Sequence, residues 1–432
     1  MDPTPDGFFC DNGRFGTLRR EVFAASCSQS SCHSIQGAKG GLVLEGLLAY
    51  SQLVGVAAEN TLARQAGLQR VRPGFPEESY LLQKLIGNPA EGEPDHLAEV
   101  GVSLSPEIID FLRHWIADAA TPSTPLDITL PLPLKGEQVV IPPFAVPPGS
   151  EVQRNFYFKL KNREEIHVNR IEFLYPPGSH HLNFFTSDAY SKPDGYFEDT
   201  FDGIPFALWP LRASSQRSRL DWKLPSGVAI KLSPFQQTLS QTHFVNIGPQ
   251  ISPIGGCASI NLHSVDAAEV PMVLGTMFLQ NNNVILPPQS ETAWDFGVTL
   301  TRFRHNEVVK AAAATGHFHW RGKSFEIRRW DGLNKNDDGS PRSGEFERMG
   351  VENRLFFSDN WDEPPFVMFG DNGPEFPRGW GIVYRTVFVN NTDRVIPFGP
   401  HVEYQEHANA FLYFYPGPEN GETFSFPLPS QQ

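Results

Sequence analysis

The sequence has no uninterrupted apolar stretch of the roughly 18 residues that a membrane helix requires. It also lacks a run of Lys and Arg, and its 432 residues carry a net charge of −14. A protein that grips phosphates needs a basic face, so we expect no nucleic-acid partner and no membrane span. The motifs of P-loop enzymes and of Ser/His/Asp hydrolases are missing as well.

Cysteine is scarce. The four residues Cys10, Cys27, Cys32 and Cys257 allow three fully paired connectivities, and their spacing does not choose among them. The start, MDPTPDGFFCDNG, has neither the charged nor the apolar region of a secretory signal. Either the protein is cytosolic or its signal is not part of this sequence, so the compartment has to be inferred from the motifs.

The first part of the chain is typical of helices. The segment SPEIIDFLRHWIADAA begins with Ser105 as a cap and Pro106 in the first helical position, and its apolar residues fall on one face. The segment PEESYLLQKLIGN has a similar stripe and ends at Gly87. We expect residues 1–122 to form a small α-helical domain that ends in a proline-rich linker at residues 120–127.

Beyond the linker the pattern changes to short strands. Runs such as QRNFYFKLKN, PMVLGTMFLQ and GWGIVYRTVFVNN are rich in aromatic and β-branched residues and are separated by turn residues. The 34 Phe, 38 Pro and 37 Gly also suit loop-rich β domains better than a helical bundle. We predict a mainly β fold with two β-sandwiches, at residues 123–284 and 285–432, divided at the segment ILPPQSET.

Two adjacent histidines, His180 and His181, interrupt an apolar strand in the segment PPGSHHLNFF. Successive strand residues point to opposite faces, so a regular strand cannot aim both at one point. Pro176, Pro177 and Gly178 lie directly upstream and predict a local irregularity of the backbone. A bend there would let both imidazoles converge on a metal ion.

Four other histidines are candidate ligands. The segment TGHFHWRGK places His317 and His319 on one face of a predicted strand, where both can bind one ion. His243 and His407 each stand beside aromatic runs. A single histidine in such a place is more often a hydrogen-bonded core residue, so the residues alone leave both interpretations open.

The motifs SHHLNFF, SQTHFVNIG, LGTMFLQNNNVILPP, GHFHWRGK and QEHANAFLYFY occur in this order. In that order they resemble the copper type II, ascorbate-dependent monooxygenases, the family of peptidylglycine α-hydroxylating monooxygenase and dopamine β-monooxygenase. The resemblance covers roughly residues 127–425. It implies two antiparallel jelly rolls, each with one copper, that face one another across a solvent-filled cleft.

The resemblance also implies a ligand set and an activity. His180, His181 and His243 would hold an electron-transferring copper. His317 and His319 would hold, with a third ligand, the copper where dioxygen hydroxylates a C–H bond of the substrate. The electrons would come from an external reductant such as ascorbate, or from a redox partner protein.

Several positions test that resemblance. Gln241 and Asn409 match the family, but His407 stands where the family has a thioether ligand. In the peptide-amidating members an arginine binds the carboxylate of the peptide and a tyrosine assists that arginine; Thr315 and Phe411 stand at these two positions here. A third imidazole would lower the copper potential, unless His407 points away and leaves a two-histidine remnant. Without a guanidinium group we expect an apolar or aromatic small molecule as substrate, bound near these positions.

A second metal motif lies near the start. Cys27, Cys32 and His33 form a C-x4-C-H motif, two residues longer than the usual haem c attachment motif. The region resembles cytochrome c-like domains fused to bacterial enzymes, and its only methionine is Met1. His96 is therefore the expected second iron ligand, and His114 is less suitable because it lies in mid-helix.

A degenerate cytochrome fold is the alternative, with Cys27 and Cys32 paired to each other or to Cys10 and with His33 solvated. Either version requires an oxidising compartment, so we expect a periplasmic or secreted protein. Our hypothesis is a copper monooxygenase with electron entry through a haem domain. The alternative is a secreted copper-binding, ligand-binding or electron-transfer protein whose second copper site is degenerate and without turnover.

Overall fold

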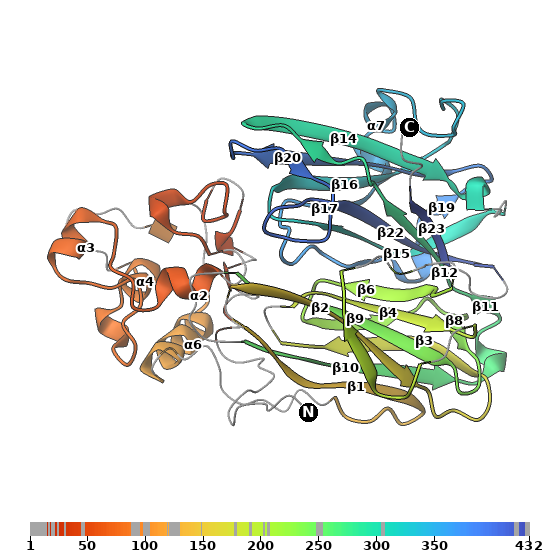
Figure 1. The fold of residues 1–432 in the computed structure, drawn as a ribbon, viewed down its shortest axis with the longest axis horizontal. Coiled ribbons are helices and arrows are strands. Elements are labelled where there is room, and N and C mark those ends of the chain that lie inside the picture. The colour runs from red at the N-terminus through yellow and green to blue at the C-terminus, as the bar shows by residue number, and fades with distance from the viewer. Residues whose placement is uncertain are drawn as a thin grey trace.

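The structure is a computed structural model that describes residues 32–44, 48–87, 104–118, 130–147, 149–176, 179–189, 192–201, 208–247, 254–303, 307–418 and 423–427, with residues 15, 18, 22–23, 26–29, 96–97, 120 and 204. The described chain is mainly β, as the sequence predicts, and most strand pairs are antiparallel. Helices prevail in the part that precedes the strands (Figure 1). Residues 121–127 of the expected linker lie outside the described residues.

The helical part contains both predicted helices. The Ser105 side-chain oxygen accepts a hydrogen bond from the Ile108 N–H and caps the second helix, which begins at Pro106. Gly87 follows the first with a φ of 69°, the left-handed conformation that ends many helices. These elements share a hydrophobic cluster that includes Trp115. The elements are η2 (Lys39–Gly41), α2 (Leu48–Leu53), α3 (Thr61–Gln65), η3 (Pro76–Glu78), α4 (Tyr80–Leu85) and α6 (Pro106–Ala117).

The first β region contains two sheets. One has the order β5-β2-β9-β4-β6, and the other has the order β1-β10-β3-β8-β11 with β7 paired to β3. We call the first of these the first inner sheet, because it carries three of the candidate ligands. The strands are β1 (Gly136–Val146), β2 (Ser150–Lys159), β3 (Ile166–Leu174), β4 (Ser179–Ser187), β5 (Tyr196–Asp199), β6 (Leu211–Ser215), β7 (Arg219–Lys223), β8 (Val228–Leu232), β9 (Gln237–Asn246), β10 (Ile254–Val265) and β11 (Met272–Val273).

The second β region has the same plan. Its inner sheet has the order β18-β15-β22-β12-β23 with β19 paired to β15, its outer sheet has the order β14-β20-β16-β17, and β13 pairs with β21. The short helix α7 (Glu345–Arg348) lies in this region. The strands are β12 (Gly275–Gln280), β13 (Ile285–Leu286), β14 (Ser290–Thr299), β15 (Val309–Phe318), β16 (Gly322–Trp330), β17 (Arg354–Ser358), β18 (Val367–Met368), β19 (Glu375–Phe376), β20 (Gly381–Asn390), β21 (Ile396–Pro397), β22 (Ala408–Tyr415) and β23 (Thr423–Pro427).

The two β regions divide earlier than the segment ILPPQSET suggests. Strand β12 precedes that segment, yet it lies between β22 and β23 in the second inner sheet. The sheets therefore divide between Leu274 and Gly275 rather than at the expected boundary of 285. The turn residues of ILPPQSET mark a loop inside the second region.

A shared core joins the two regions. Phe278, Phe411 and Tyr413 of the second region belong to the same buried cluster as the core of the first. The ring centroid of Tyr413 lies 4.8 Å from that of Trp222, and its hydroxyl accepts a hydrogen bond from the Ser214 N–H at 2.9 Å. The Ser214–Tyr413 hydrogen bond joins β6 of the first inner sheet to β22 of the second, so that side chains of both inner sheets can meet.

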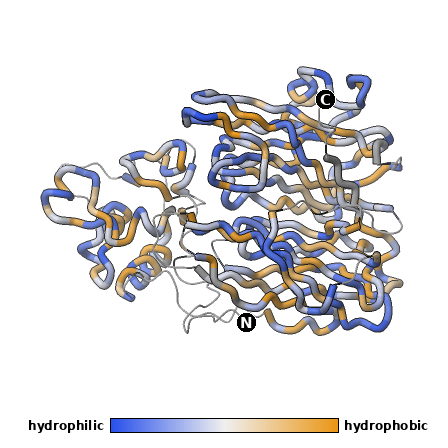
Figure 2. The backbone as a smooth tube through the Cα atoms, viewed as in Figure 1, coloured by the Kyte–Doolittle hydropathy of each residue, from blue (hydrophilic) through white to orange (hydrophobic). Residues whose placement is uncertain are grey.

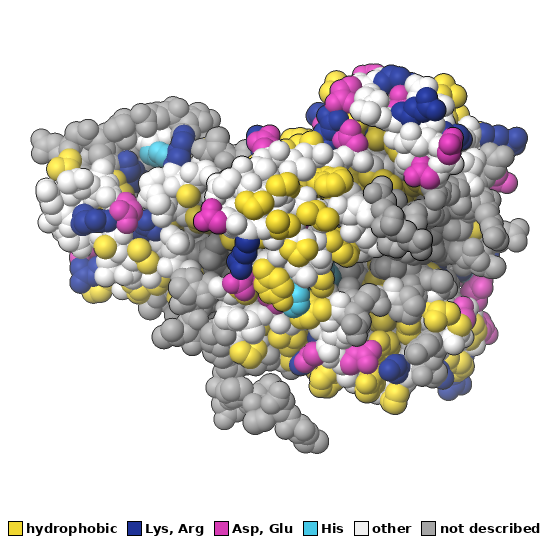
Figure 3. Space-filling view, turned by 45° about the horizontal axis from the view of Figure 1, so that its top comes forward, with side chains coloured by type: hydrophobic (Ala, Val, Ile, Leu, Met, Phe, Trp, Pro, Cys, Tyr) yellow, Lys and Arg dark blue, Asp and Glu magenta, His cyan; other side chains and the backbone are white. Residues whose placement is uncertain are grey.

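Apolar and polar residues alternate along many strands (Figure 2). On the face shown in Figure 3 acidic and basic side chains are interspersed, and hydrophobic side chains gather over the β regions. Among the described helices none is long and apolar enough to span a bilayer.

We expect Tyr413→Phe to lower the free energy of unfolding by about 1–3 kcal/mol, because it leaves the buried Ser214 N–H without its partner. Chemical denaturation measures the change. Tyr384→Phe is the control, since the Tyr384 hydroxyl makes only a 3.4 Å contact, with the Ala408 carbonyl of its own region. Equal losses in the two variants would contradict a structural role for the hydrogen bond between the regions.

Candidate metal centre

The backbone irregularity predicted at the histidine pair is present. Strand β4 pairs Ser179 with Phe244 but His181 with His243, so His180 is one extra residue on this strand. Such a bulge bends the strand and re-aims its side chains. The ring centroids of His180 and His181 lie 5.5 Å apart, and both residues are buried. Pro177 and Gly178 lie outside the described residues.

His243 joins this pair from the neighbouring strand. It lies on β9, in the middle of the first inner sheet, and it is 1% exposed. Its ring centroid is 5.2 Å from that of His180 and 5.3 Å from that of His181. The structure therefore brings together the three residues that were expected to form the first site.

The other three histidines meet on the second inner sheet. His317 lies near the end of β15, His319 follows that strand, and His407 directly precedes β22. The His407 ring centroid is 4.2 Å from that of His319 and 4.7 Å from that of His317. His407 therefore does not point away from the strand that carries the His-x-His pair.

All six rings form one cluster, which we call the histidine cluster. The centroid of His180 lies 4.6 Å from that of His317 and 5.0 Å from that of His319, closer than it lies to His181. This differs from the expected pair of cages on either side of a solvent-filled cleft. The cause is the packing of the two inner sheets through their shared core, which leaves the two sets of imidazoles in contact.

The cluster contains ring nitrogens that could hold a metal ion. Four buried nitrogens have no hydrogen-bond partner: His180 Nε2, His181 Nδ1, His317 Nδ1 and His319 Nε2. Ligand atoms of His180, His317 and His319 lie within 4.8 Å of one another. An orphaned buried polar atom costs free energy, and a shared metal ion would satisfy several at once. An all-imidazole donor set suits copper, zinc, iron or nickel.

Hydrogen bonds on the far side of two rings fix their orientation. His319 Nδ1 lies 3.2 Å from the Gln405 carbonyl, so it donates there and leaves Nε2 for a metal. His243 Nε2 lies 3.1 Å from a carboxylate oxygen of Glu151, which also accepts hydrogen bonds from the Val402 and Glu403 N–H groups. Such supporting partners set the tautomer and the basicity of metal-binding imidazoles.

His317 and His407 contact each other directly. Their Nε2 atoms are 2.6 Å apart, the distance of a hydrogen bond. Two nitrogens that each bind one tetrahedral ion at about 2 Å would lie about 3.3 Å apart, so this pair would have to separate before both could bind one ion. As the side chains stand, these two atoms satisfy each other, and the Nδ1 atom of His317 is the one left without a hydrogen-bond partner.

Burial keeps five of the six rings uncharged near neutral pH. Desolvation, followed by repulsion from neighbouring imidazoles, holds the pKa of His180, His181, His317 and His407 well below the usual value. Burial also lowers the pKa of His319, to about 3. Neutral imidazole is the form that binds metal, so this environment favours ligation.

Sequence reasoning missed Glu151. Burial raises the pKa of its carboxyl group. The hydrogen bond and charge of His243 and the two backbone N–H groups lower the pKa by more than burial raises it, so the pKa lies below the usual range. Glu151 is on β2 and pairs with β9 across the sheet. No spacing motif links it to His243, 92 residues away, so only strand pairing could have revealed it.

A cavity of about 170 Å³ opens on the cluster, lined in part by His181, His317 and His407. Asn409 and Phe411, two of the expected substrate-binding residues, also line it. Thr315, the third, does not line it, and the Thr315 hydroxyl donates to the Pro365 carbonyl at 3.0 Å.

Gln241, which lies two positions before His243, also lines the cavity. Its side-chain oxygen accepts a hydrogen bond from Asn183 Nδ2 at 3.0 Å. Gln241 therefore lies beside the histidine cluster with its carbonyl end already paired.

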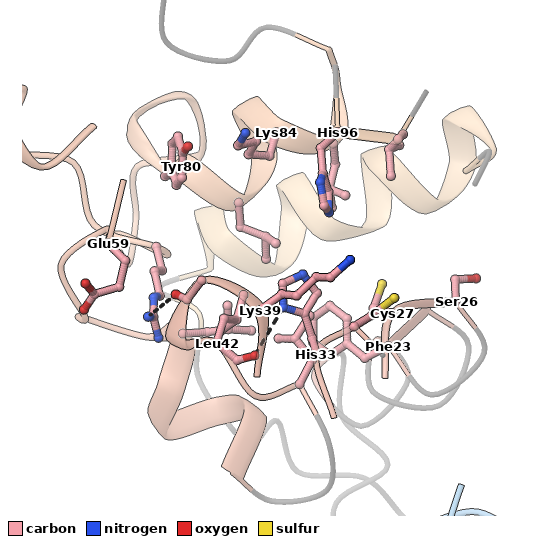
Figure 4. Close-up of a pocket in the computed structure, with 18 of the residues that line it drawn as sticks. Phe23, Ser26, Cys27, His33, Lys39, Leu42, Glu59, Tyr80, Lys84 and His96 are labelled. Atoms are coloured by element: carbon pink, nitrogen blue, oxygen red, sulfur yellow. Dashed lines mark hydrogen bonds between the residues drawn. The ribbon is translucent and has the colours of Figure 1, made fainter. Parts of the chain in front are cut away.

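A larger cavity, of about 550 Å³, lies in the helical part (Figure 4). Cys27, Cys32, His33 and His96 all line it. The ring centroids of His33 and His96 are 5.9 Å apart, and His33 Nδ1 lies 3.2 Å from the Leu42 carbonyl, which leaves its Nε2 for a ligand. His114 is on the exposed side of α6, beside Asp110. The structure thus brings together the four residues expected to bind haem.

The cysteines of this cavity are not paired with each other. Burial raises the pKa of the Cys27 thiol to about 12, with a further contribution from Cys32. Burial also lowers the pKa of His33. Cys257, by contrast, is disulfide-bonded. The alternative in which Cys27 and Cys32 form a disulfide with one another is therefore wrong for this structure.

One contact connects the helical part to the histidine cluster. Gln36 Nε2 lies 3.5 Å from the carbonyl oxygen of Arg321. Gln36 comes three residues after His33, and Arg321 comes two residues after His319. Ile35 packs against the core of the second β region. The segment directly after His33 therefore contacts the segment directly after His319.

No protein-family model matches the chain, and no curated protein matches it. Among solved structures, the chain is similar to the tail fiber protein gp63.1 from E. coli phage G7C, with 9% identity and a TM-score of 0.18, over 69% of this chain and 41% of that one. It is also similar to a secreted protein from Eubacterium rectale, with 9% identity and a TM-score of 0.12, over 60% of this chain and 68% of that one. Scores this low define neither a fold nor a function.

We expect Glu151→Gln to weaken Cu(II) binding by about 10–100-fold, because His243 loses the carboxylate that orients it. A competition titration against a chelator of known affinity measures the change. Glu172→Gln is the matched control, because Glu172 contacts His263 at 2.5 Å in the same way on the other sheet of the first region. Equal copper affinity in Glu151→Gln and the unmodified chain would show that the pair does not support a metal site.

Proposed function

We propose that this chain is a copper-dependent monooxygenase that hydroxylates a C–H bond of a small organic substrate with dioxygen. The observation that carries the proposal is the convergence of buried, unpartnered imidazole nitrogens beside a cavity of organic-ligand size. The two β regions would correspond to the two jelly rolls of the copper type II, ascorbate-dependent monooxygenases, which the order of the motifs resembles.

The histidine cluster would hold the copper. His180, His317 and His319 have the closest set of ligand atoms, and six imidazoles suffice for two ions with three nitrogens each. When bound, copper cycles between two oxidation states and activates dioxygen. The net reaction places one oxygen atom in the C–H bond and releases the other as water, with two electrons and two protons from ascorbate or a redox partner.

The remaining residues around the cluster would position the reactants. Glu151 and the Gln405 carbonyl hold two of the imidazoles in one orientation. Asn409 and Phe411 lie on the face of β22 that lines the cavity, in sequence register with His407. The apolar part of the lining limits the entry of water to the reaction.

We propose that electrons enter through a haem c in the helical part. The cavity volume falls within the range of cofactor sites, about 300–1,000 Å³. The Cys27 and Cys32 thiols would each add across a porphyrin vinyl group, forming a thioether without net oxidation. His33 and His96 would be the axial ligands, since two imidazoles on one ion have centroids about 6 Å apart.

Two further features support this electron entry. Lys39, Arg70 and Lys84 line the same cavity and would offset the negative charge of the propionates. The contact between Gln36 and the Arg321 carbonyl gives a short route from the peptide of His33 to that of His319. The disulfide at Cys257 supports a periplasmic or secreted location, because cytosolic thiols stay reduced.

A second candidate function is a secreted copper- or ligand-binding protein without turnover. The observation in its favour is the 2.6 Å contact between His317 and His407, which leaves neither Nε2 atom open to a metal. The missing thioether ligand points the same way.

Copper content and oxygen uptake distinguish the two functions. For an enzyme we expect two coppers per chain and ascorbate-dependent dioxygen consumption, whereas a binder would hold one copper and consume none. His319→Ala removes an orphaned ligand atom, so we expect the affinity for copper to fall by more than about 100-fold and oxygen uptake to stop. His167→Ala, on β3, is the control and keeps both properties.

The haem proposal has its own test. We expect chain made in a periplasm with a cytochrome c maturation system to carry covalently bound haem, visible by absorption and by haem staining of a denaturing gel. The variant Cys27→Ser with Cys32→Ser should lose the covalent haem, while His114→Ala should keep it, because His114 lies outside the cavity. Matured chain without any haem absorption would contradict electron entry by this route.

A further inference from the structure

The 170 Å³ cavity beside the histidine cluster has a lining without ionic side chains. Its described walls contain no Asp, Glu, Lys or Arg. Five carboxamides line it instead: Gln153, Asn183, Gln241, Gln280 and Asn409. A charged ligand would lose its hydration there without gaining a counter-charge, which is unfavourable. The lining therefore selects against carboxylates and ammonium groups.

The aromatic walls suit a single ring. Phe278 and Phe411 face each other with ring centroids 5.0 Å apart at an interplanar angle of 49°. Phe185, Phe201 and Phe398 also line the cavity, together with the aliphatic Ile204, Leu211 and Pro400. A dry apolar cavity of about 150 Å³ binds benzene in another protein, so about 170 Å³ accepts one ring with a small substituent.

Among the carboxamides of the lining, one atom differs from the others. The Asn183 amide donates to Gln241, Gln153 donates to the Thr200 carbonyl, and Gln280 donates to Asn282. The side-chain oxygen of Asn409, in contrast, is buried without a hydrogen-bond partner, in a residue that is only 7% exposed. A ligand that donates an O–H or N–H to this oxygen would satisfy it.

Asn409 lies opposite the metal-binding strand. It is the direct partner of His317 in the pairing of β15 with β22. Side chains paired in this way have Cβ atoms about 5 Å apart. A group held by Asn409 therefore places the rest of a one-ring ligand against the histidine cluster.

We propose that this cavity binds an uncharged, single-ring aromatic compound that carries a hydroxyl or amide hydrogen-bond donor, with the donor on Asn409 and the ring against the wall that Phe278 and Phe411 form together. The inference rests on the proposed function for the identity of this ligand as the substrate. The binding itself follows from the cavity alone.

The test compares four probes on the full chain, with and without added copper, by calorimetric titration: phenol, toluene, benzoate and benzylamine. We expect phenol to bind best and each of the other three to bind at least about tenfold more weakly, because toluene lacks the donor and the other two are charged. Tightest binding of benzoate or benzylamine would overturn the proposal, as would equal binding of phenol and toluene.

Two variants locate the site. Asn409→Ala should remove the preference for phenol over toluene, while Asn155→Ala, which deletes a buried carboxamide outside the cavity, should keep it. Phe278→Ala should enlarge the cavity and admit 2-naphthol, which the unmodified chain excludes. If phenol binds as expected but copper does not, the proposed function fails and the ligand class stands. If copper and oxygen uptake hold but phenol does not bind, only the ligand class fails.

Discussion

The account depends on buried imidazole nitrogens that lack hydrogen-bond partners. Six buried histidines packed within a protein core satisfy each other poorly, and four of their nitrogens remain without any partner. Burial of this kind destabilises a fold unless a bound ion supplies the missing interactions. The features nearby agree with such a role, because Glu151 and the Gln405 carbonyl orient two of the rings from behind.

Two local features of the strands and one long-range contact create the histidine cluster. The bulge at His180 turns two adjacent histidines toward the second inner sheet, and the His-x-His spacing puts His317 and His319 on one side of their strand. The shared core around Tyr413 then brings the two sheets together. The bulge and the spacing act within one strand, whereas the last step depends on residues almost 200 positions apart, Ser214 and Tyr413.

This division explains what the sequence could predict. Ser105 and Pro106 predict the start of α6 because capping is local. The residues before His180 predict a bulge because proline cannot donate to a strand ladder and glycine tolerates a bend. The sequence could not reveal that His180 meets His317, since that contact depends on how two sheets pack. The membership of β12 in the second region and the support of His243 by Glu151 likewise arise from strand pairing across long stretches of chain.

X-ray absorption at the copper edge of the loaded chain tests the central claim most directly. The account predicts a first shell of nitrogen with the multiple-scattering pattern of several imidazoles and no sulfur, because the third residue that adjoins His317 and His319 is another histidine, His407. A sulfur neighbour, or a shell of oxygen with fewer than two imidazoles, would contradict it.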